Sequence, residues 1–240
     1  MCIERAIKDF REKLLEPLFA DITRTLEVTC HKSGDENHGS NFVGNAAVLS
    51  GIETLAQFVD PNTEEEHRVF REQAKEHYKS IDNHKKKYVT PRYSPSEGSE
   101  LAKTFMKEYF CASVFKKKEF GVPLYDLIWT FRNPHMHAFY PYYHRTFNTK
   151  KVSGAVDWLY LDPGKRIGIT IKQVEENFDA RKQQLYRIED DWFRICPQIL
   201  FVFFKQAVDK FITEVCNDTD VQKRFCENYR RLAGVYDFVA

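Results

Sequence analysis

Residues 124–141 read LYDLIWTFRNPHMHAFYP and carry the clearest structural signal in the chain. Their first half repeats apolar residues at helical spacing: Leu124, Leu127, Ile128 and Phe131. Pro134 then follows Asn133, and a proline disfavours helical geometry in the residue before it and cannot donate a backbone hydrogen bond. We therefore expect the helix to end here and a short second helix to begin, with Asn133 as its N-cap and Pro141 as its end.

This arrangement would place Arg132 just before a helix N-terminus and His137 one turn inside it. Free backbone N–H groups and the positive end of the helix dipole favour anions at such a position. An arginine, a histidine and a helix N-terminus together suit a phosphodiester. A purely structural alternative is that Asn133 caps a helix while Arg132 pairs with a carboxylate and fixes the helix junction.

The order Arg132-Asn133-x-x-x-His137 resembles the Arg-x4-6-His signature of HEPN domains, in which a polar residue often follows the arginine. A second segment, residues 41–59, resembles the glycine- and alanine-rich second helix of some HEPN-like proteins and contains Glu53. The resemblance spans roughly residues 42–141. It implies a mainly α protein built on a HEPN-like helical bundle.

The same resemblance implies a metal-independent endoribonuclease that acts as a homodimer, because HEPN ribonucleases line one shared cleft with two motifs. The ribose 2′-OH would attack the phosphodiester, Arg132 would stabilise the developing charge, and His137 would transfer a proton. Asn133 would orient or cap, and supporting roles fall to His135, Tyr140 and Glu53. HEPN toxins commonly carry a tyrosine two residues after the histidine, a position that is Phe139 here.

Many HEPN-like proteins are inactive scaffolds or ligand-binding units. The alternative function is therefore a non-catalytic dimeric module that senses nucleotides or RNA or binds another protein. A toxin- or defence-like role would add an antitoxin-like or other protein partner. No cofactor is expected, because nucleotide-binding glycine loops and the common hydrolase motifs are absent from the sequence.

No metal is expected either. The polar loop over residues 31–40 contains His31, Asp35 and His38, but its composition supplies no fixed ligand geometry. His135, His137 and His144 could mimic a metal set, yet no cysteine or carboxylate lies beside them.

Glu53 lies among apolar residues of a predicted helix over residues 42–59, where a buried carboxylate needs a partner. Arg132 is the partner we expect, and an exposed helix edge is the alternative for Glu53. A lysine run follows another predicted helix and would face the same opening as Arg132, as a local RNA-binding patch: Lys116, Lys117 and Lys118. Solvated surface lysines are the alternative.

The composition limits the classes of protein that fit. The 240 residues are 42% hydrophobic and include 36 Lys and Arg against 35 Asp and Glu, for a net charge of +1, so any RNA contact must depend on local patches. Six cysteines without a C-x-x-C pair favour reduced thiols in a cytoplasmic protein. No signal peptide is apparent, and no apolar run reaches the ~20 residues that span a bilayer, so no membrane partner is expected.

We predict three segments in one compact domain: a helical bundle with the Arg-x4-His motif over residues 1–145, a β-hairpin over 146–171, and C-terminal helices over 172–240. The bundle would contain helices over residues 3–29, bent at Pro17, and over 42–59, 64–88 and 97–115. Hairpin strands over 152–161 and 166–171 would flank a turn and form an accessory flap. Helices over 172–195, 199–215 and 220–232 would follow. The second of these is apolar on most sides and would need a second protomer to cover it.

Overall fold

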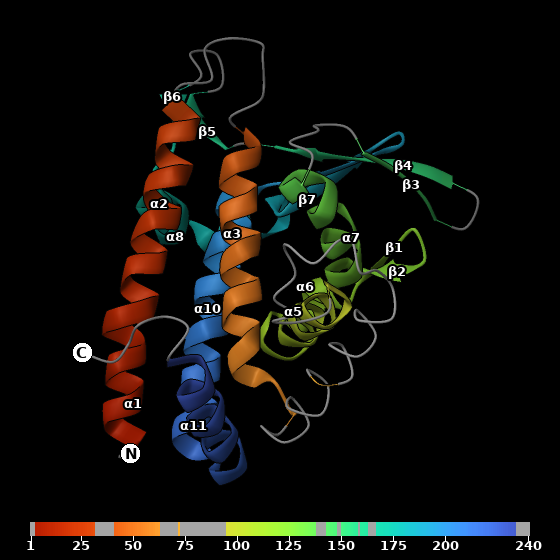
Figure 1. Cartoon of the computed structure of the whole chain (residues 1–240). Coiled ribbons are helices and arrows are strands. Elements are labelled where there is room, and N and C mark those ends of the chain that lie inside the picture. Colours follow the sequence, from red (N-terminus) through yellow and green to blue (C-terminus); the bar gives the residue numbers. More distant parts are fainter. Residues whose placement is uncertain are drawn as a thin grey trace, which may run out of the picture.

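Helix α10 (Pro197–Asn217) runs through the helical part of the molecule, seen here in a computed structural model (Figure 1). Its first residue is Pro197, whose missing N–H would have no intrahelical partner at this position. Every side chain from Pro197 to Phe204 is buried, and beyond Lys205 buried residues such as Phe211 alternate with exposed ones at helical spacing. The covering helices belong to the same chain: α3 (Asn41–Ala56), α5 (Pro95–Tyr109), α8 (Ile171–Glu176) and α11 (Thr219–Ala233). The expectation that a second protomer must cover this helix is wrong, because intrachain packing already buries it.

The structure describes residues 3–31, 41–62, 72, 95–137, 143–147, 150–157, 159–162 and 167–233. The polar loop over 32–40 lies outside these ranges, as does the predicted helix over 64–88 apart from Glu72. Across the described residues, no helix has both the length and the apolar character that crossing a membrane requires.

The predicted N-terminal helix is confirmed, and its irregularity lies where the proline predicts it. Helix α1 (Ile3–Phe10) leads through the π-helical turn η1 (Arg11–Leu15) into α2 (Glu16–His31). Pro17 has no N–H to donate to the carbonyl of Lys13. Lys13 lies within η1, so the π-helical turn is located where this hydrogen bond is missing.

Aromatic side chains join the two ends of the chain. The Phe10 ring centre lies 4.7 Å from that of Phe58, in the 3₁₀ turn η3 (Gln57–Val59), and 5.3 Å from that of Phe225 in α11. The Asn228 Nδ2 atom of α11 also donates to the carbonyls of Phe58 and Asp60, at 3.2 and 2.9 Å. The predicted last helix is confirmed, and it is tied to the end of α3 by both apolar and polar contacts.

The predicted helix over 97–115 is present as α5 followed by the short α6 (Ala112–Phe115). A small hairpin, β1 (Lys118–Glu119) and β2 (Val122–Pro123), then leads into α7 (Leu124–His137). The hairpin turn has positive φ at Phe120 and Gly121, 53° and 84°. Only the glycine adopts this conformation without steric cost.

The strands form a larger sheet than predicted. Four strands lie in the order β3 (Tyr143–Phe147), β4 (Lys150–Val156), β8 (Trp192–Ile195) and β7 (Tyr186–Glu189), and the β4–β8 pair is parallel. Only β5 (Tyr160–Asp162) and β6 (Ile167–Gly168) form the predicted hairpin. The prediction that residues 152–171 form an accessory flap is therefore wrong. Strand β4 is an inner strand of the sheet, and Val152, Ile169 and Ile171 lie in the core.

The prediction of one helix over residues 172–195 is also wrong, except for its first turns, which form α8. Helix α8, α9 (Phe178–Arg181) and the 3₁₀ turn η4 (Lys182–Gln184) are followed by the hairpin β7–β8. Asp190 in the β7–β8 turn has φ of 51°, which no right-handed helix accommodates.

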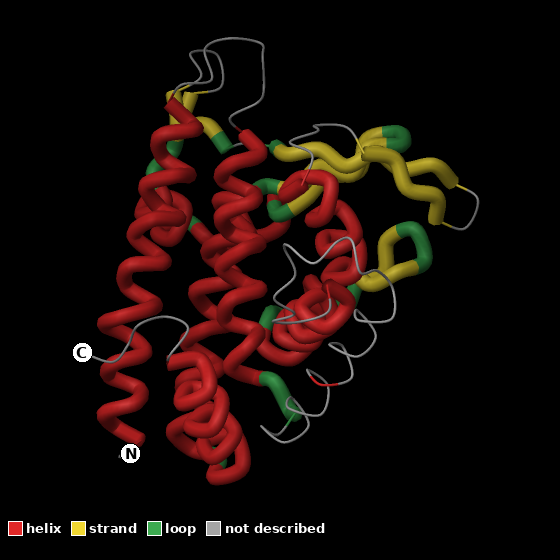
Figure 2. The backbone as a smooth tube through the Cα atoms, viewed as in Figure 1, coloured by secondary structure: helices red, strands yellow, loops and turns green. Residues whose placement is uncertain are grey.

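The described chain is nonetheless mainly α, with the strands toward the top and right of the view (Figure 2). The parallel β4–β8 pair joins the segments over 146–171 and 172–240 in one core.

We predict that Gly154→Ala destabilises the protein. A Cβ atom at Gly154 would lie 2.3 Å from Cδ1 of the buried Phe131 ring, so α7 and β4 could not keep their present separation. Overpacking of this kind costs about 1–3 kcal/mol, more than the glycine-to-alanine gain in backbone entropy. Urea unfolding measures the loss. Combining Gly154→Ala with Phe131→Leu should recover part of it, and an unchanged stability of the single variant would contradict this packing.

Candidate functional site

Arg132 lies on α7, and its Nη2 donates a hydrogen bond to the Glu53 carboxylate on α3. The Arg132 side chain is 10% exposed and the Glu53 side chain 29%, so the guanidinium is buried while the carboxylate retains access to solvent. A buried charge needs a partner of opposite sign. The expected pairing of these two residues is therefore confirmed, across 79 positions of the sequence.

Trp129 is a third member of this cluster. The guanidinium carbon of Arg132 lies 5.3 Å from the centre of the Trp129 ring, within the range of a cation–π interaction. Trp129 is buried, and its Nε1 has no hydrogen-bond partner in the part of the chain that the structure describes. Trp129 is not among the site residues predicted from the sequence. Its position three residues before Arg132, on the same helix face, was the available signal.

The position of Glu53 depends on a glycine two residues earlier. A Cβ atom at Gly51 would lie 2.9 Å from Ile22 Cδ1 and 3.0 Å from Phe204 Cε1, so only a glycine lets α3 approach both α2 and α10 this closely. Residues two apart on a helix point about 200° apart around its axis. Glu53 is therefore on the opposite side of α3, where α7 lies. Gly51 thus allows the close packing of α3 that a larger side chain would prevent.

The sheet fixes α7 from another side. Phe131, next to Arg132, stacks on Phe193 of β8 with ring centres 5.7 Å apart, and its ring also lies against Gly154 of β4. Helix α7 is thus held between α3 and the sheet. Arg132 is placed by tertiary packing on both sides, as well as by its ion pair.

One helix, rather than two, crosses the central motif. Helix α7 is continuous from Leu124 to His137 and includes Pro134, so the predicted restart and the N-cap role of Asn133 are wrong. Pro134 removes only the hydrogen bond to the carbonyl of Thr130, and extending an existing helix by one more turn is far easier than nucleating a new one. Arg132 consequently does not precede a helix N-terminus. The described part of α7 runs from Leu124 to His137, so the motif lies toward its C-terminal side, where the helix dipole favours cations.

The structure describes the helical backbone of residues 133–137 but not their side chains, and Tyr140 lies outside the described residues. Positions 132 and 137 of a continuous helix are about 140° apart around the axis and ~7.5 Å apart along it. Asn133, His135 and His137 therefore occupy the last turns of α7. Their predicted roles remain predictions.

The three lysines lie between α6 and α7, and hydrogen bonds hold one of them in position. Lys117 is placed by a closed set of hydrogen bonds: its Nζ lies 2.8 Å from Glu119 Oε1 and 3.2 Å from the Tyr186 hydroxyl, which in turn donates to Glu119 Oε1 at 2.6 Å. Burial opposes ionisation of Glu119, but the hydrogen bonds from Lys117 and Tyr186 lower its pKa. Lys117 precedes α7. The opening that the lysines were expected to share with Arg132 stays a prediction. Lys116 and Lys118 are exposed.

Two further features bear on chemistry in the described ranges: metal-ligand groupings and reactive thiols. Over these ranges, no three His, Cys, Asp or Glu side chains are grouped as a metal site. The described cysteines are free thiols: Cys111, Cys196, Cys216 and Cys226. Burial raises the pKa of Cys196 to about 12, so this thiol stays protonated and unreactive at neutral pH.

No family model, curated protein or solved structure matches this chain. Arg132, Glu53 and Trp129 form the cluster at the candidate site whose side chains the structure describes.

We predict that Glu53→Ala lowers the free energy of unfolding by about 1–3 kcal/mol, because it leaves the buried Arg132 guanidinium without its carboxylate. The matched control is Glu100→Ala, which removes an exposed ion pair with Lys103 at 3.0 Å and should change stability by less than about 0.5 kcal/mol. Both values come from urea unfolding. Equal effects of the two substitutions would show that the Glu53–Arg132 pair contributes no more than a surface pair.

Proposed function

We propose that this chain is a HEPN-like, metal-independent endoribonuclease that acts as a homodimer. The observation that carries the proposal is the buried ion pair between Arg132 and Glu53, on the helix that contains the Arg-Asn-x3-His sequence. A guanidinium held by a carboxylate and by the Trp129 ring has its position set before substrate arrives. Charge stabilisation by a preorganised group needs little reorganisation during the reaction.

In the proposed reaction the ribose 2′-OH attacks the adjacent phosphorus atom and the 5′-oxygen leaves. Arg132 stabilises the negative charge that builds up on the phosphate oxygens, and Glu53 acts as its positioning residue. His137 transfers a proton, and Asn133 orients the end of α7. The products are a 2′,3′-cyclic phosphate and a 5′-hydroxyl. This mechanism requires RNA, because DNA lacks the attacking group.

The proposal includes a homodimer for a chemical reason. The reaction needs a base for the 2′-OH and an acid for the leaving oxygen, while each chain brings one Arg-His set. The wide angular separation of positions 132 and 137 on one helix also favours a site completed by a second copy. A two-fold axis near the C-terminal end of α7 would bring both motifs to one cleft.

The burial of Arg132 favours a second candidate function. A guanidinium that is only 10% exposed and already paired with Glu53 also suits a fixed structural junction. The chain would then be a non-catalytic dimeric module that binds a nucleotide, RNA or another protein. The two functions differ in one observable, the cleavage of single-stranded RNA by the purified wild-type protein.

We predict that wild type cleaves single-stranded RNA in the presence of EDTA, that its products end in 2′,3′-cyclic phosphate, and that 2′-O-methyl RNA resists. His137→Ala should lower the rate by about 10²–10⁴-fold through loss of proton transfer. Arg132→Ala should lower it by about 10²–10³-fold. Asn133→Ala should have a smaller effect. Gel analysis of end-labelled RNA measures all three rates.

The Arg132→Ala variant requires a folding control, because it leaves the Glu53 carboxylate without its ion-pair partner. The double variant Glu53→Ala/Arg132→Ala removes both charges, and its circular dichroism and melting curve report whether the bundle is intact. Cleavage that needs added divalent metal, or equal cleavage of 2′-O-methyl RNA, would contradict the mechanism. A folded wild type that cuts no RNA would leave the non-catalytic module as the function.

We also predict a dimer in light scattering at micromolar concentration. The expected interface contains the C-terminal end of α7 and leaves α10 in the interior of each chain, where it is already buried. A variant with His137→Arg should retain its fold yet weaken the dimer, because it places two added cations near the axis. A monomeric wild type with full ribonuclease activity would rule out the shared cleft.

A further inference from the structure

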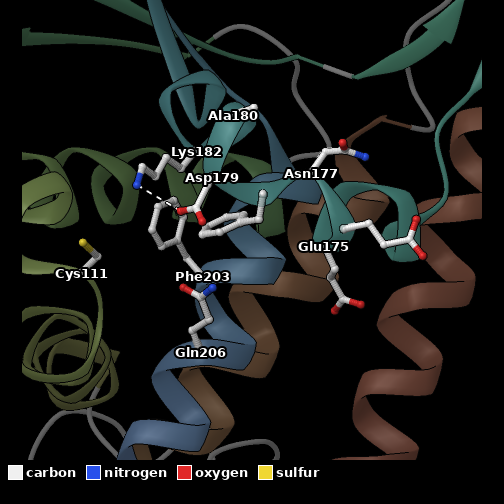
Figure 3. A pocket seen from close by; sticks show the side chains of 10 residues that line it. Cys111, Glu175, Asn177, Asp179, Ala180, Lys182, Phe203 and Gln206 are labelled. Atoms are coloured by element: carbon white, nitrogen blue, oxygen red, sulfur yellow. Dashed lines mark hydrogen bonds and ion pairs between the residues drawn. The ribbon is translucent and has the colours of Figure 1, made fainter.

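Two cavities adjoin on the side of the molecule where α6 faces the segment from α8 to β7. The first, which we call the basic cavity, has a volume of about 610 Å³, and its wall includes Val114, Lys117, Glu119, Lys182, Tyr186 and Arg187. The second, the acidic cavity, has a volume of about 580 Å³, and its wall includes Glu175, Glu176, Asp179 and Phe203. Cys111 and Lys182 line both. In Figure 3 the Lys182 side chain extends toward the side of the acidic cavity on which Cys111 lies.

The two cavities differ in the sign of their charge. Three cationic side chains and one carboxylate line the basic cavity, whereas three carboxylates and one lysine line the acidic cavity. A small anion is therefore attracted to the first and repelled from the second. The volume of the basic cavity lies within the range of small-molecule sites, and Val114 and Ile188 add apolar surface to its wall.

Lys117 is held in position at this cavity. Its ammonium group has three N–H donors, and two of them are directed to Glu119 and Tyr186. The side chain is 62% exposed, so the third donor is accessible from solvent. A lysine fixed in this way loses less side-chain entropy when it binds an anion than a freely rotating surface lysine would.

Lys182 can turn toward an anion at little cost. Its ion pair with Asp179, at 3.2 Å, is open to solvent, because the Asp179 side chain is 95% exposed. Pairs of this kind are weak in water. Arg187, by contrast, is held by Asp157 at 2.6 Å and by Glu189 at 2.9 Å, and these two carboxylates offset its charge. The attraction of the cavity for an anion therefore comes from Lys117 and Lys182.

We infer that the basic cavity is a binding site for a small phosphate-bearing molecule, whose phosphate lies between Lys117 and Lys182 and whose remaining part contacts Val114 and Ile188. Lysines bind phosphate as compact point charges. This site is separate from Arg132 and goes beyond the proposed ribonuclease function. Its presence or absence does not depend on whether the chain cleaves RNA.

The test uses Cys111 as a reporter, because it is an exposed thiol on the wall of the cavity. The full-length protein is treated with iodoacetamide at low salt, with and without 10 mM inorganic pyrophosphate or adenosine monophosphate, and alkylation of each cysteine is followed by mass spectrometry. Both probes should slow alkylation of Cys111 at least about fivefold at saturation. Cys216, an exposed thiol on α10 outside this cavity, should react at an unchanged rate.

Lys182→Gln should raise the pyrophosphate concentration that gives half-protection by about fivefold, the effect of one solvent-exposed charge at contact distance. The matched control is Lys172→Gln, an 84% exposed lysine on α8 that lines neither cavity, and it should leave that concentration unchanged. Protection by pyrophosphate alone would identify the ligand as a small inorganic phosphate, and protection by both would identify a nucleotide-sized ester. No protection by either probe, or equal effects of the two substitutions, would overturn the assignment.

Discussion

The complete burial of the first two turns of α10, residues 197–204, is the constraint on which the rest of the fold depends. Because no side chain in these turns is exposed, other elements must surround them, whereas Gln206, Asp209 and Lys210 are exposed further along the helix. Helices α3, α5, α8 and α11 contact α10 within one chain.

The candidate site follows from that packing. Because α3 approaches α10 through Gly51, its opposite side faces α7, and Glu53 meets Arg132 there. The sheet closes on α7 through Phe131 and Gly154, so the arginine cannot move away from the carboxylate without disturbing the core. The Glu53–Arg132 pair, with its arginine buried, is thus a consequence of the packing of α7 between α3 and the sheet. Cleavage of RNA, the substrate that we propose, would show that this pair serves chemistry as well as structure.

The sequence predicted those features that depend on neighbours along the chain. Helical periodicity located α2, α3, α5, α10 and α11, and Pro17 marked the π-helical turn. A buried carboxylate in need of a cation predicted the Glu53–Arg132 pair. Prediction failed where distant contacts override local preference. Pro134 should have ended α7 but does not, because packing of Phe131 and Arg132 on both sides holds the helix together. The spacing over residues 174–195 fitted a helix, yet Trp192–Ile195 gains a parallel partner in β4 that no local pattern could reveal.

A subunit-mixing experiment tests the central claim most directly, because it asks whether two copies of the motif form one site. Wild type and His137→Ala protein are unfolded together, refolded at equal amounts, and assayed for RNA cleavage per total protein. If both motifs are needed in one cleft, only pure wild-type dimers act, and activity falls to about a quarter of the wild-type value. A residual activity of about a half would mean that each chain works alone and would contradict the shared site.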